Sequence, residues 1–326
     1  MTGASAGVGR ATARAFGARG DAVALLARGV DGLEAARAEI ERAGSEALVL
    51  PTDVADAQQV EAAAAATEKR FGTIDIWINN ATVSVFSPVL QMTAEEFRRV
   101  TEVTYLGYVH GTLAALRRMV PRNRGTIVQV GSALAHRAIP LQSAYCAAKH
   151  AIAGFTESLR TELLHDRSAV HLTMVQLPAI NTPQFDWNRN RMARKPQPIP
   201  PIFQPEVAAA AIVWAATHPR RELYVGWPTM KAILGDKIAP GLLDRYLAAH
   251  GYDAQQTDEP APDVRSDNLW DPLPGDRGAH GRFGTRARSF SWQLWATTHR
   301  WRALALLGSV AGLGWTMMRW QRRNAD

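Results

Sequence analysis

The sequence predicts an α/β protein with a doubly wound (Rossmann), mostly parallel β-sheet and helices on both of its faces. Two observations lead to this prediction. Short apolar segments alternate with helical segments of ten or more residues, which is typical of strand–helix–strand units joined by right-handed crossovers. The chain also opens on a glycine-rich stretch, Thr-Gly-Ala-Ser-Ala-Gly-Val-Gly at residues 2–9, just ahead of the first helical segment.

The alternation continues to about residue 226 without a change in composition, so it predicts one domain. We expect strands at residues 21–27, 46–50, 74–78, 126–130, 170–177 and 222–226, and helices at 10–19, 30–43, 56–71, 93–119, 143–165 and 205–217. Residues 183–204 interrupt the pattern with five prolines. A connection of this length inside a compact domain is typical of a functional lid.

The composition divides the chain into three expected parts. Residues 1–252 form the Rossmann-type domain. Residues 253–299 are rich in Asp, Pro, Gly and Arg with little hydrophobic periodicity, which predicts a linker. Residues 300–323 are predicted to form a hydrophobic C-terminal helix.

The 326-residue chain has a net charge of +7, and most of the excess lies near the C-terminus. From residue 261 onward, ten arginines stand against five aspartates, a net +5, which leaves +2 for residues 1–260. The predicted domain is thus nearly neutral, which argues against a nucleic acid as partner.

The only cysteine is Cys146, so the chain cannot form an internal disulfide or a cysteine-based zinc site. This favours a reducing, cytoplasmic location. No cluster of histidine, cysteine and carboxylate residues has metal-ligand spacing, and we expect no metal. A packed, inert thiol is the expected state of Cys146.

Residues 303–318 carry no charge and are bracketed by Trp301-Arg302 and Arg319-Trp320. Sixteen residues fall short of the ~20 that span a bilayer, although flanking arginines can snorkel and tryptophans favour the interface. Three interpretations stay open: a membrane anchor, a helix lying in the membrane interface, and a helix docked on the protein or a partner.

The glycine-rich stretch predicts a phosphate site. Glycines let the backbone approach a pyrophosphate closely, and the helix that follows offers unpaired N–H groups at its positive end. The strand at 21–27 follows at the spacing of a dinucleotide-binding unit and ends at Arg28. An acid there would bind the ribose 2′-hydroxyl of NAD, whereas an arginine can pair with the 2′-phosphate of NADP. We therefore expect NADP(H) rather than NAD(H).

Acid–base chemistry is predicted from three residues. Tyr145 and Lys149 are four positions apart and so share one helix face. A lysine ammonium beside a phenol favours the phenolate, so we expect the pKa of Tyr145 to be lowered. Ser132 follows the strand at 126–130, at the sheet edge where ligands bind in such folds.

These motifs together resemble the classical short-chain dehydrogenase/reductase family over roughly residues 1–230. The resemblance rests on Thr-Gly-x-x-x-Gly-x-Gly at residues 2–9, Asp53-Val54, Asn79-Asn80-Ala81, Ser132 and Tyr145-x-x-x-Lys149. It implies that Ser132 holds the substrate oxygen, that Tyr145 transfers its proton, and that Lys149 tunes Tyr145 and anchors the nicotinamide ribose. The residues expected to bind the cofactor are Gly3, Ser5, Gly7, Val8, Gly9, Arg28, Asp53, Val54, Asn80, Ala81, Tyr145, Lys149, Pro178 and Thr182. The resemblance further implies a homo-oligomer, a dimer or tetramer.

Three positions depart from the family pattern. Thr104 stands where the family has a catalytic asparagine, Thr82 follows Asn79-Asn80-Ala81 in place of glycine, and Ala179 follows Pro178 in place of glycine. In the family a central strand precedes the glycine loop, whereas here only Met1 does. We expect that strand to lie upstream in a longer chain, or the chain to be truncated.

We expect an NADP(H)-dependent oxidoreductase that interconverts a secondary alcohol and a ketone on a hydrophobic small molecule. The apolar side chains of the proline-rich segment, among them Trp187 and Ile199, motivate the substrate class. The alternative is a catalytically weak or inactive cofactor-sensing scaffold at a membrane or partner surface, which the departures at Thr104, Thr82 and Ala179 motivate.

Overall fold

Parallel strands form the centre of the molecule in a computed structural model, which describes residues 1–263, 265–303 and 305. Four strands pair in the order β10 (Glu222–Tyr224), β6 (Val170–Leu177), β5 (Gly125–Ser132) and β3 (Ile76–Asn79). Two more, β1 (Val23–Ala27) and β2 (Ala47–Pro51), form a second parallel pair. These six strands lie within two residues of the predicted bounds.

Met1 and Thr2 lie between β1 and β3. The Met1 amino group donates to the Ala24 carbonyl at 2.8 Å, and Leu26 N donates to the Met1 carbonyl at 2.9 Å. On the other side, Thr2 N donates to the Ile78 carbonyl at 3.0 Å. These two residues therefore link the two sheets, at the position of the central strand that the family resemblance implies. Burial lowers the pKa of the Met1 amino group to about 5.

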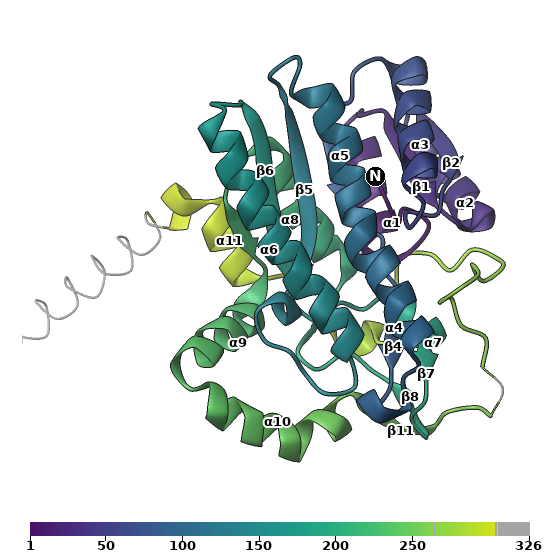
Figure 1. The fold of residues 1–326 in the computed structure, drawn as a ribbon, viewed down its shortest axis with the longest axis vertical. Coiled ribbons are helices and arrows are strands. Elements are labelled where there is room, and N and C mark those ends of the chain that lie inside the picture. Colours follow the sequence, from purple (N-terminus) through teal and green to yellow (C-terminus); the bar gives the residue numbers. More distant parts are fainter. Residues whose placement is uncertain (264, 304, 306–326) are drawn as a thin grey trace, which may run out of the picture.

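Helices cover both faces of the sheet, as predicted (Figure 1). One layer contains α1 (Gly7–Gly17), α2 (Val30–Arg42) and α8 (Pro205–Thr217). The opposite layer contains α3 (Ala57–Phe71), α5 (Gly107–Met119) and α6 (Ser143–His165). Each layer buries its own apolar cluster against the strands, as expected for strands that are apolar on both faces.

The long helix expected at 93–119 is interrupted. It comprises α4 (Ala94–Thr101), a π-helical turn at Glu102–Leu106, and α5. Thr93 starts α4 with a capping box that it forms with Glu96. The π turn places Thr104 against the backbone of Val83, and such turns are frequent at functional sites.

Two helices that we did not predict follow β10, namely α9 (Gly226–Ile238) and α10 (Pro240–Ala254). Their apolar residues do not follow a clear helical period, and much of each helix is exposed. They project from one end of the domain, with α11 (Trp292–Thr298) nearby (Figure 1).

Short strands of the proline-rich segment, residues 183–204, pair with distant parts of the chain. That segment contains α7 (Gln184–Trp187), β7 (Arg189–Asn190), β8 (Arg194–Pro196) and β9 (Ile202–Phe203). Their partners are β4 (Val85–Phe86) for β7, β11 (Gln256–Pro260) for β8 and β12 (Ala287–Arg288) for β9. The described residues of the expected linker thus pack along the domain, while the division of the chain at 252 and 299 stays a prediction.

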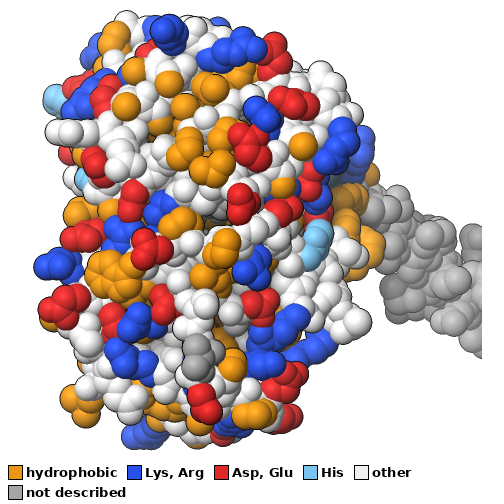
Figure 2. Space-filling model, turned by 90° about the vertical axis from the view of Figure 1, so that its right-hand side faces the viewer, with side chains coloured by type: hydrophobic (Ala, Val, Ile, Leu, Met, Phe, Trp, Pro, Cys, Tyr) orange, Lys and Arg blue, Asp and Glu red, His pale blue; other side chains and the backbone are white. Residues whose placement is uncertain are grey.

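The hydrophobic segment at 303–318 lies almost wholly outside the described residues, so its three interpretations remain predictions. Among the residues that the structure describes, no helix has the length and apolar character needed to cross a membrane. On the face drawn in Figure 2, positive and negative side chains alternate with apolar ones, without a single-sign patch.

Candidate active site

One cavity of about 520 Å³ runs along the carboxyl ends of the strands. Ligands bind at this edge of doubly wound sheets. Most residues predicted from the sequence line this cavity: Gly3, Ser5, Gly7, Val8, Arg28, Asp53, Val54, Asn80, Ala81, Ser132, Tyr145, Lys149, Pro178 and Thr182. Of the predicted residues, Gly9 and Thr104 lie outside its lining.

Ser132 and Tyr145 meet at the middle of the cavity. Ser132 is the last residue of β5, and its hydroxyl both accepts from Leu134 N at 3.1 Å and is hydrogen-bonded to Tyr145. Tyr145 lies in the first turn of α6. The sheet edge and the helix start thus bring together two side chains that are thirteen positions apart.

Lys149 lies one turn further along α6 and is 2% exposed. Its Nζ donates to the Tyr108 hydroxyl at 3.0 Å and to the Val130 carbonyl at 2.8 Å. It lies 5.5 Å from the centre of the Tyr145 ring. Burial lowers the pKa of Lys149 to about 7.

The pKa of Tyr145 differs from the expectation. Burial raises it well above its usual value, and the hydrogen bond with Ser132 opposes this effect only in part. Lys149 does not offset the burial because, with a pKa of about 7, it is already neutral at the pH where the phenol loses its proton. Tyr145 is therefore a protonated phenol across the neutral range.

Thr104 does not contact Lys149. Its hydroxyl donates to the Val83 carbonyl at 2.9 Å, accepts from Val83 N at 3.1 Å and lies 3.2 Å from the Thr82 hydroxyl. The residue that does reach Lys149 from this helix is Tyr108, which is fully buried and which we did not predict. The available signal was its spacing, since Tyr108 is four positions after Thr104 and so lies on the same helix face.

The glycine loop turns tightly into α1. Gly3 and Gly7 have φ angles of +67° and +58°, which favour glycine. Gly9 faces the loop itself, because a β-carbon there would lie 1.9 Å from the Gly3 carbonyl oxygen. Its role is therefore close packing of α1 on the loop, while Gly3 and Gly7 line the cavity.

Charged residues lie at the end of the cavity that is lined by the glycine loop, Arg28 and Asp53, which we call the nucleotide end. Arg28 follows the last residue of β1, and Asp31, the next acid along the chain, accepts a hydrogen bond from Gly275 N at 2.6 Å. Asp53 is paired with Arg99 at 2.5 Å. Desolvation and the neighbouring Arg99 lower the pKa of Arg28, while Asp53 opposes this shift.

The floor of the cavity fits a nicotinamide. Asn80 donates from Nδ2 to the carbonyls of Thr2 and Gly3, both at 3.2 Å, which holds the loop beside β3. Thr182 is 7% exposed, and its hydroxyl has no hydrogen-bond partner in the part of the chain that the structure describes. An unpaired buried hydroxyl at the cavity wall suits a ligand with a polar group such as a carboxamide.

The end of the cavity away from the glycine loop, which we call the far end, is largely apolar. Its walls come from the loop after β5, the proline-rich segment, and helices α9 and α10: Leu134, Ile139, Phe185, Trp187, Pro198, Ile199, Pro228, Ala232, Leu243, Tyr246 and Leu247. Arg137 joins these walls by pairing with Asp236 of α9 at 2.8 Å and Asp244 of α10 at 2.6 Å. Of the apolar residues in the proline-rich segment, Trp187 and Ile199 line the cavity, whereas Ile202 and Phe203 are buried in the core.

The glycine loop, the parallel sheet and the Ser132–Tyr145–Lys149 group define an NAD(P)-binding oxidoreductase of the Rossmann type. The model of the short chain dehydrogenase family matches residues 1–193. The chain belongs to this family.

Known relatives agree with this assignment. The chain is 32% identical to an uncharacterized oxidoreductase, YxnA, of Bacillus subtilis over 96% of this chain and 87% of that protein. It is 39% identical to the human dehydrogenase/reductase SDR family member 7 over about half of each chain, 50% and 49%. It is 36% identical to 2-(R)-hydroxypropyl-CoM dehydrogenase of Xanthobacter autotrophicus over 65% of this chain and 86% of that one.

A solved structure shares the fold. The alcohol dehydrogenase of Thermococcus sibiricus, in complex with 5-hydroxy-NADP, aligns with a TM-score of 0.58 and 27% identity over 69% of this chain and 94% of that one. The predicted Rossmann-type α/β fold is thus confirmed.

Proposed function

We propose that this protein is an NADP(H)-dependent oxidoreductase that interconverts a secondary alcohol and a ketone on a hydrophobic small molecule. The observation that supports it most is the meeting of Ser132, Tyr145 and Lys149 in the same cavity as the glycine loop. A relative named for oxidising a hydroxypropyl group supports the alcohol chemistry.

In the proposed reaction a nicotinamide cofactor, when bound, would supply or accept the hydride. Ser132 donates its hydroxyl to the substrate oxygen and holds it beside Tyr145. In the reductive direction Tyr145 donates its phenolic proton to that oxygen as it gains charge, and in the oxidative direction it takes the proton back. Lys149 lies behind the Tyr145 ring and, when protonated, stabilises the phenolate that forms.

The proposed preference for NADP(H) rests on the charges at the nucleotide end. Arg28 directly follows β1, at the position where an acid would favour NAD. Two carboxylates near it are already engaged, since Asp31 binds the Gly275 amide and Asp53 binds Arg99. The neighbour of known structure was solved with an NADP derivative.

The proposed substrate class rests on the apolar far end of the cavity. Trp187, Ile199 and Leu243 offer contact area to a hydrophobic body, and few polar groups there would bind a charged one. We further propose a homo-oligomer, on family resemblance and on apolar side chains exposed along α5 and α6, including Leu113 and Leu164.

Oxidation of NADPH in the presence of a panel of hydrophobic ketones tests the proposal. We expect turnover with the wild-type protein and loss of turnover in Tyr145→Phe. Tight NADPH binding without turnover of any ketone or alcohol would instead support a cofactor-sensing scaffold.

A further inference from the structure

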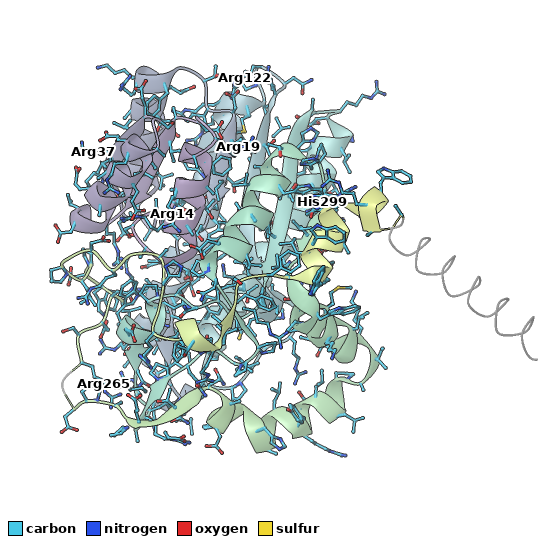
Figure 3. All side chains as sticks on the ribbon, turned by 180° about the vertical axis from the view of Figure 1, so that it is seen from behind. Arg14, Arg19, Arg37, Arg122, Arg265 and His299 are labelled. Carbon is cyan, nitrogen blue, oxygen red and sulfur yellow. The ribbon has the colours of Figure 1, made fainter. Side chains whose placement is uncertain are left out.

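The described residues near the C-terminus cross the nucleotide end of the cavity, a feature that the proposed function does not use. We call residues 268–283 the strap. In Figure 3 the yellow-green chain that leads to α11 lies across the near side of the molecule. The strap begins beside Arg28 at the end of β1, passes the start of α1, and ends beside the loop that follows β6.

The first anchor of the strap lies at the end of β1. The Arg28 guanidinium donates to the carbonyls of Asn268 and Trp270, each at 2.5 Å, and Arg99 Nε donates to the Leu269 carbonyl at 3.1 Å. The Leu269 side chain is fully buried in the cluster that contains Leu26, Val54 and Val103. This end is therefore held by both apolar burial and charge-assisted hydrogen bonds.

The second anchor lies at the start of α1. The Gly278 carbonyl accepts from Gly7 N at 3.0 Å, and Asp276 lies 3.4 Å from Arg10. Ala279 is buried against Ala11 and Ala209. Here the strap supplies an acceptor to the same helix N-terminus that the glycine loop presents to a phosphate.

The third anchor lies beside the loop after β6. Gly281 N donates to the Asn181 carbonyl at 3.2 Å, and Phe283 N donates to Asn181 Oδ1 at 3.0 Å. A β-carbon at Gly281 would lie 2.4 Å from the Thr182 carbonyl oxygen, so only glycine fits this crossing. Thr182 is also one of the residues that line the cavity.

Between the anchors the strap faces the cavity through Pro272, Leu273, Gly275 and Arg277. Arg277 is exposed, and its guanidinium donates to the Pro274 carbonyl within its own turn at 3.3 Å. It directly precedes Gly278, which touches the start of α1. A guanidinium at this position suits a diphosphate because it forms charge-assisted, bidentate hydrogen bonds with phosphate oxygens.

We propose that the strap is a wall of the cofactor site and that Arg277 binds the diphosphate of the nicotinamide cofactor. The inference rests on the proposed function, since it requires a nicotinamide cofactor in this cavity. It extends the site beyond the Rossmann core, because residues more than 260 positions after the glycine loop complete it. Both NADP(H) and NAD(H) carry the diphosphate, so Arg277 acts on both, whereas only Arg28 is proposed to bind the 2′-phosphate, in addition to anchoring the strap.

Binding titrations with NADPH, NADH and ADP test the role of Arg277. We expect Arg277→Ala to raise the Kd of all three by about tenfold, the effect of losing one or two hydrogen bonds to a charged group. Arg277→Lys should recover part of the loss. Arg288→Ala is the matched control, because Arg288 carries the same charge on β12 outside the cavity lining, and its Kd values should stay within about twofold of wild type.

Hydrogen exchange of the strap amides, measured on the wild-type protein with and without NADPH, gives a readout independent of turnover. We expect exchange over residues 268–283 to slow when NADPH binds. Faster exchange there would mean that the cofactor displaces the strap, which would overturn the inference. Unchanged binding by Arg277→Ala would overturn the inference alone, whereas wild-type protein that binds neither NADPH nor NADH would overturn the proposed function as well.

Discussion

The two ends of the cavity are built in different ways. The nucleotide end combines tight backbone turns at Gly3 and Gly7 with arginines and carboxylates that hydrogen-bond to backbone or to each other. The far end is made of apolar side chains from α9, α10 and the proline-rich segment. The nucleotide end is thus shaped by backbone geometry and charge, with residues 268–283 packed across it, whereas the far end is shaped by the apolar packing of separate elements.

Substitution of Tyr145, which lies between the two ends, should give the largest effect on activity. Tyr145→Phe removes the proton donor and leaves the cavity shape intact, so we expect kcat to fall by about 10²–10⁴-fold. NADPH affinity should change little, because the ring and Lys149 remain. Steady-state kinetics with a responsive ketone and an NADPH titration measure the two quantities, and unchanged turnover would refute the role of Tyr145.

The nucleotide end should respond to Arg28→Gln. Glutamine keeps an amide donor for the strap carbonyls but has no charge for a 2′-phosphate. We expect the Kd of NADPH to rise by about tenfold and that of NADH to stay within about threefold. Leu269→Ala is the comparison, since it loosens the strap without removing a charge and should affect both cofactors equally. An equal loss of both cofactors in Arg28→Gln would argue against 2′-phosphate recognition.

The far end should respond to Arg137→Ala. This variant removes the ion pairs to Asp236 and Asp244 that join the loop after β5 to α9 and α10. We expect KM for bulky substrates to rise severalfold, because the apolar walls are less well positioned, while NADPH affinity stays the same. Arg221→Ala, which breaks a pair with Glu157 on the exposed surface, is the control and should leave KM unchanged. Equal changes in KM and cofactor affinity would mean that the two ends are coupled.

The last effect is on stability rather than on activity or binding, and it concerns Lys149. Burial lowers its pKa from 10.5 to about 7, so between these pH values the unfolded chain binds the proton that the folded chain has lost. The free energy of unfolding therefore gains up to about 1.4 kcal/mol per pH unit from this group as pH rises through that window, and this gain is lost as pH falls toward 7.

Lys149→Met lacks this dependence. We expect the wild-type Tm to rise relative to that of Lys149→Met between pH 7 and 9.5, as measured by thermal unfolding at several pH values. Below about pH 7 both states bind the proton, and the difference in Tm should level off. A difference that is constant over the whole range would show that Lys149 is charged in the folded protein.

The strand and helix periods along residues 10–226 were sufficient to predict the central fold, and the motifs with the family resemblance predicted most cavity residues. This worked because motifs such as residues 2–9 and the Tyr145–Lys149 pair are local, and local geometry follows from residue type. Three features could not be predicted in this way. The contact of Tyr108 with Lys149 joins two helices, α9 and α10 have weak periodicity, and the role of Gly9 depends on how α1 packs against Gly3.

The sequence alone determined the fold class, the family and the chemical character of Ser132, Tyr145 and Lys149, because these depend on residue type and spacing. Tertiary structure decided what each group touches. Packing turns Lys149 toward Tyr108 and Val130 and raises the pKa of Tyr145 by burial. It also brings residues 268–283 onto the nucleotide end. The sequence could not show this placement, because hydrogen bonds to backbone carbonyls such as that of Leu269 do not depend on the type of residue that supplies the carbonyl.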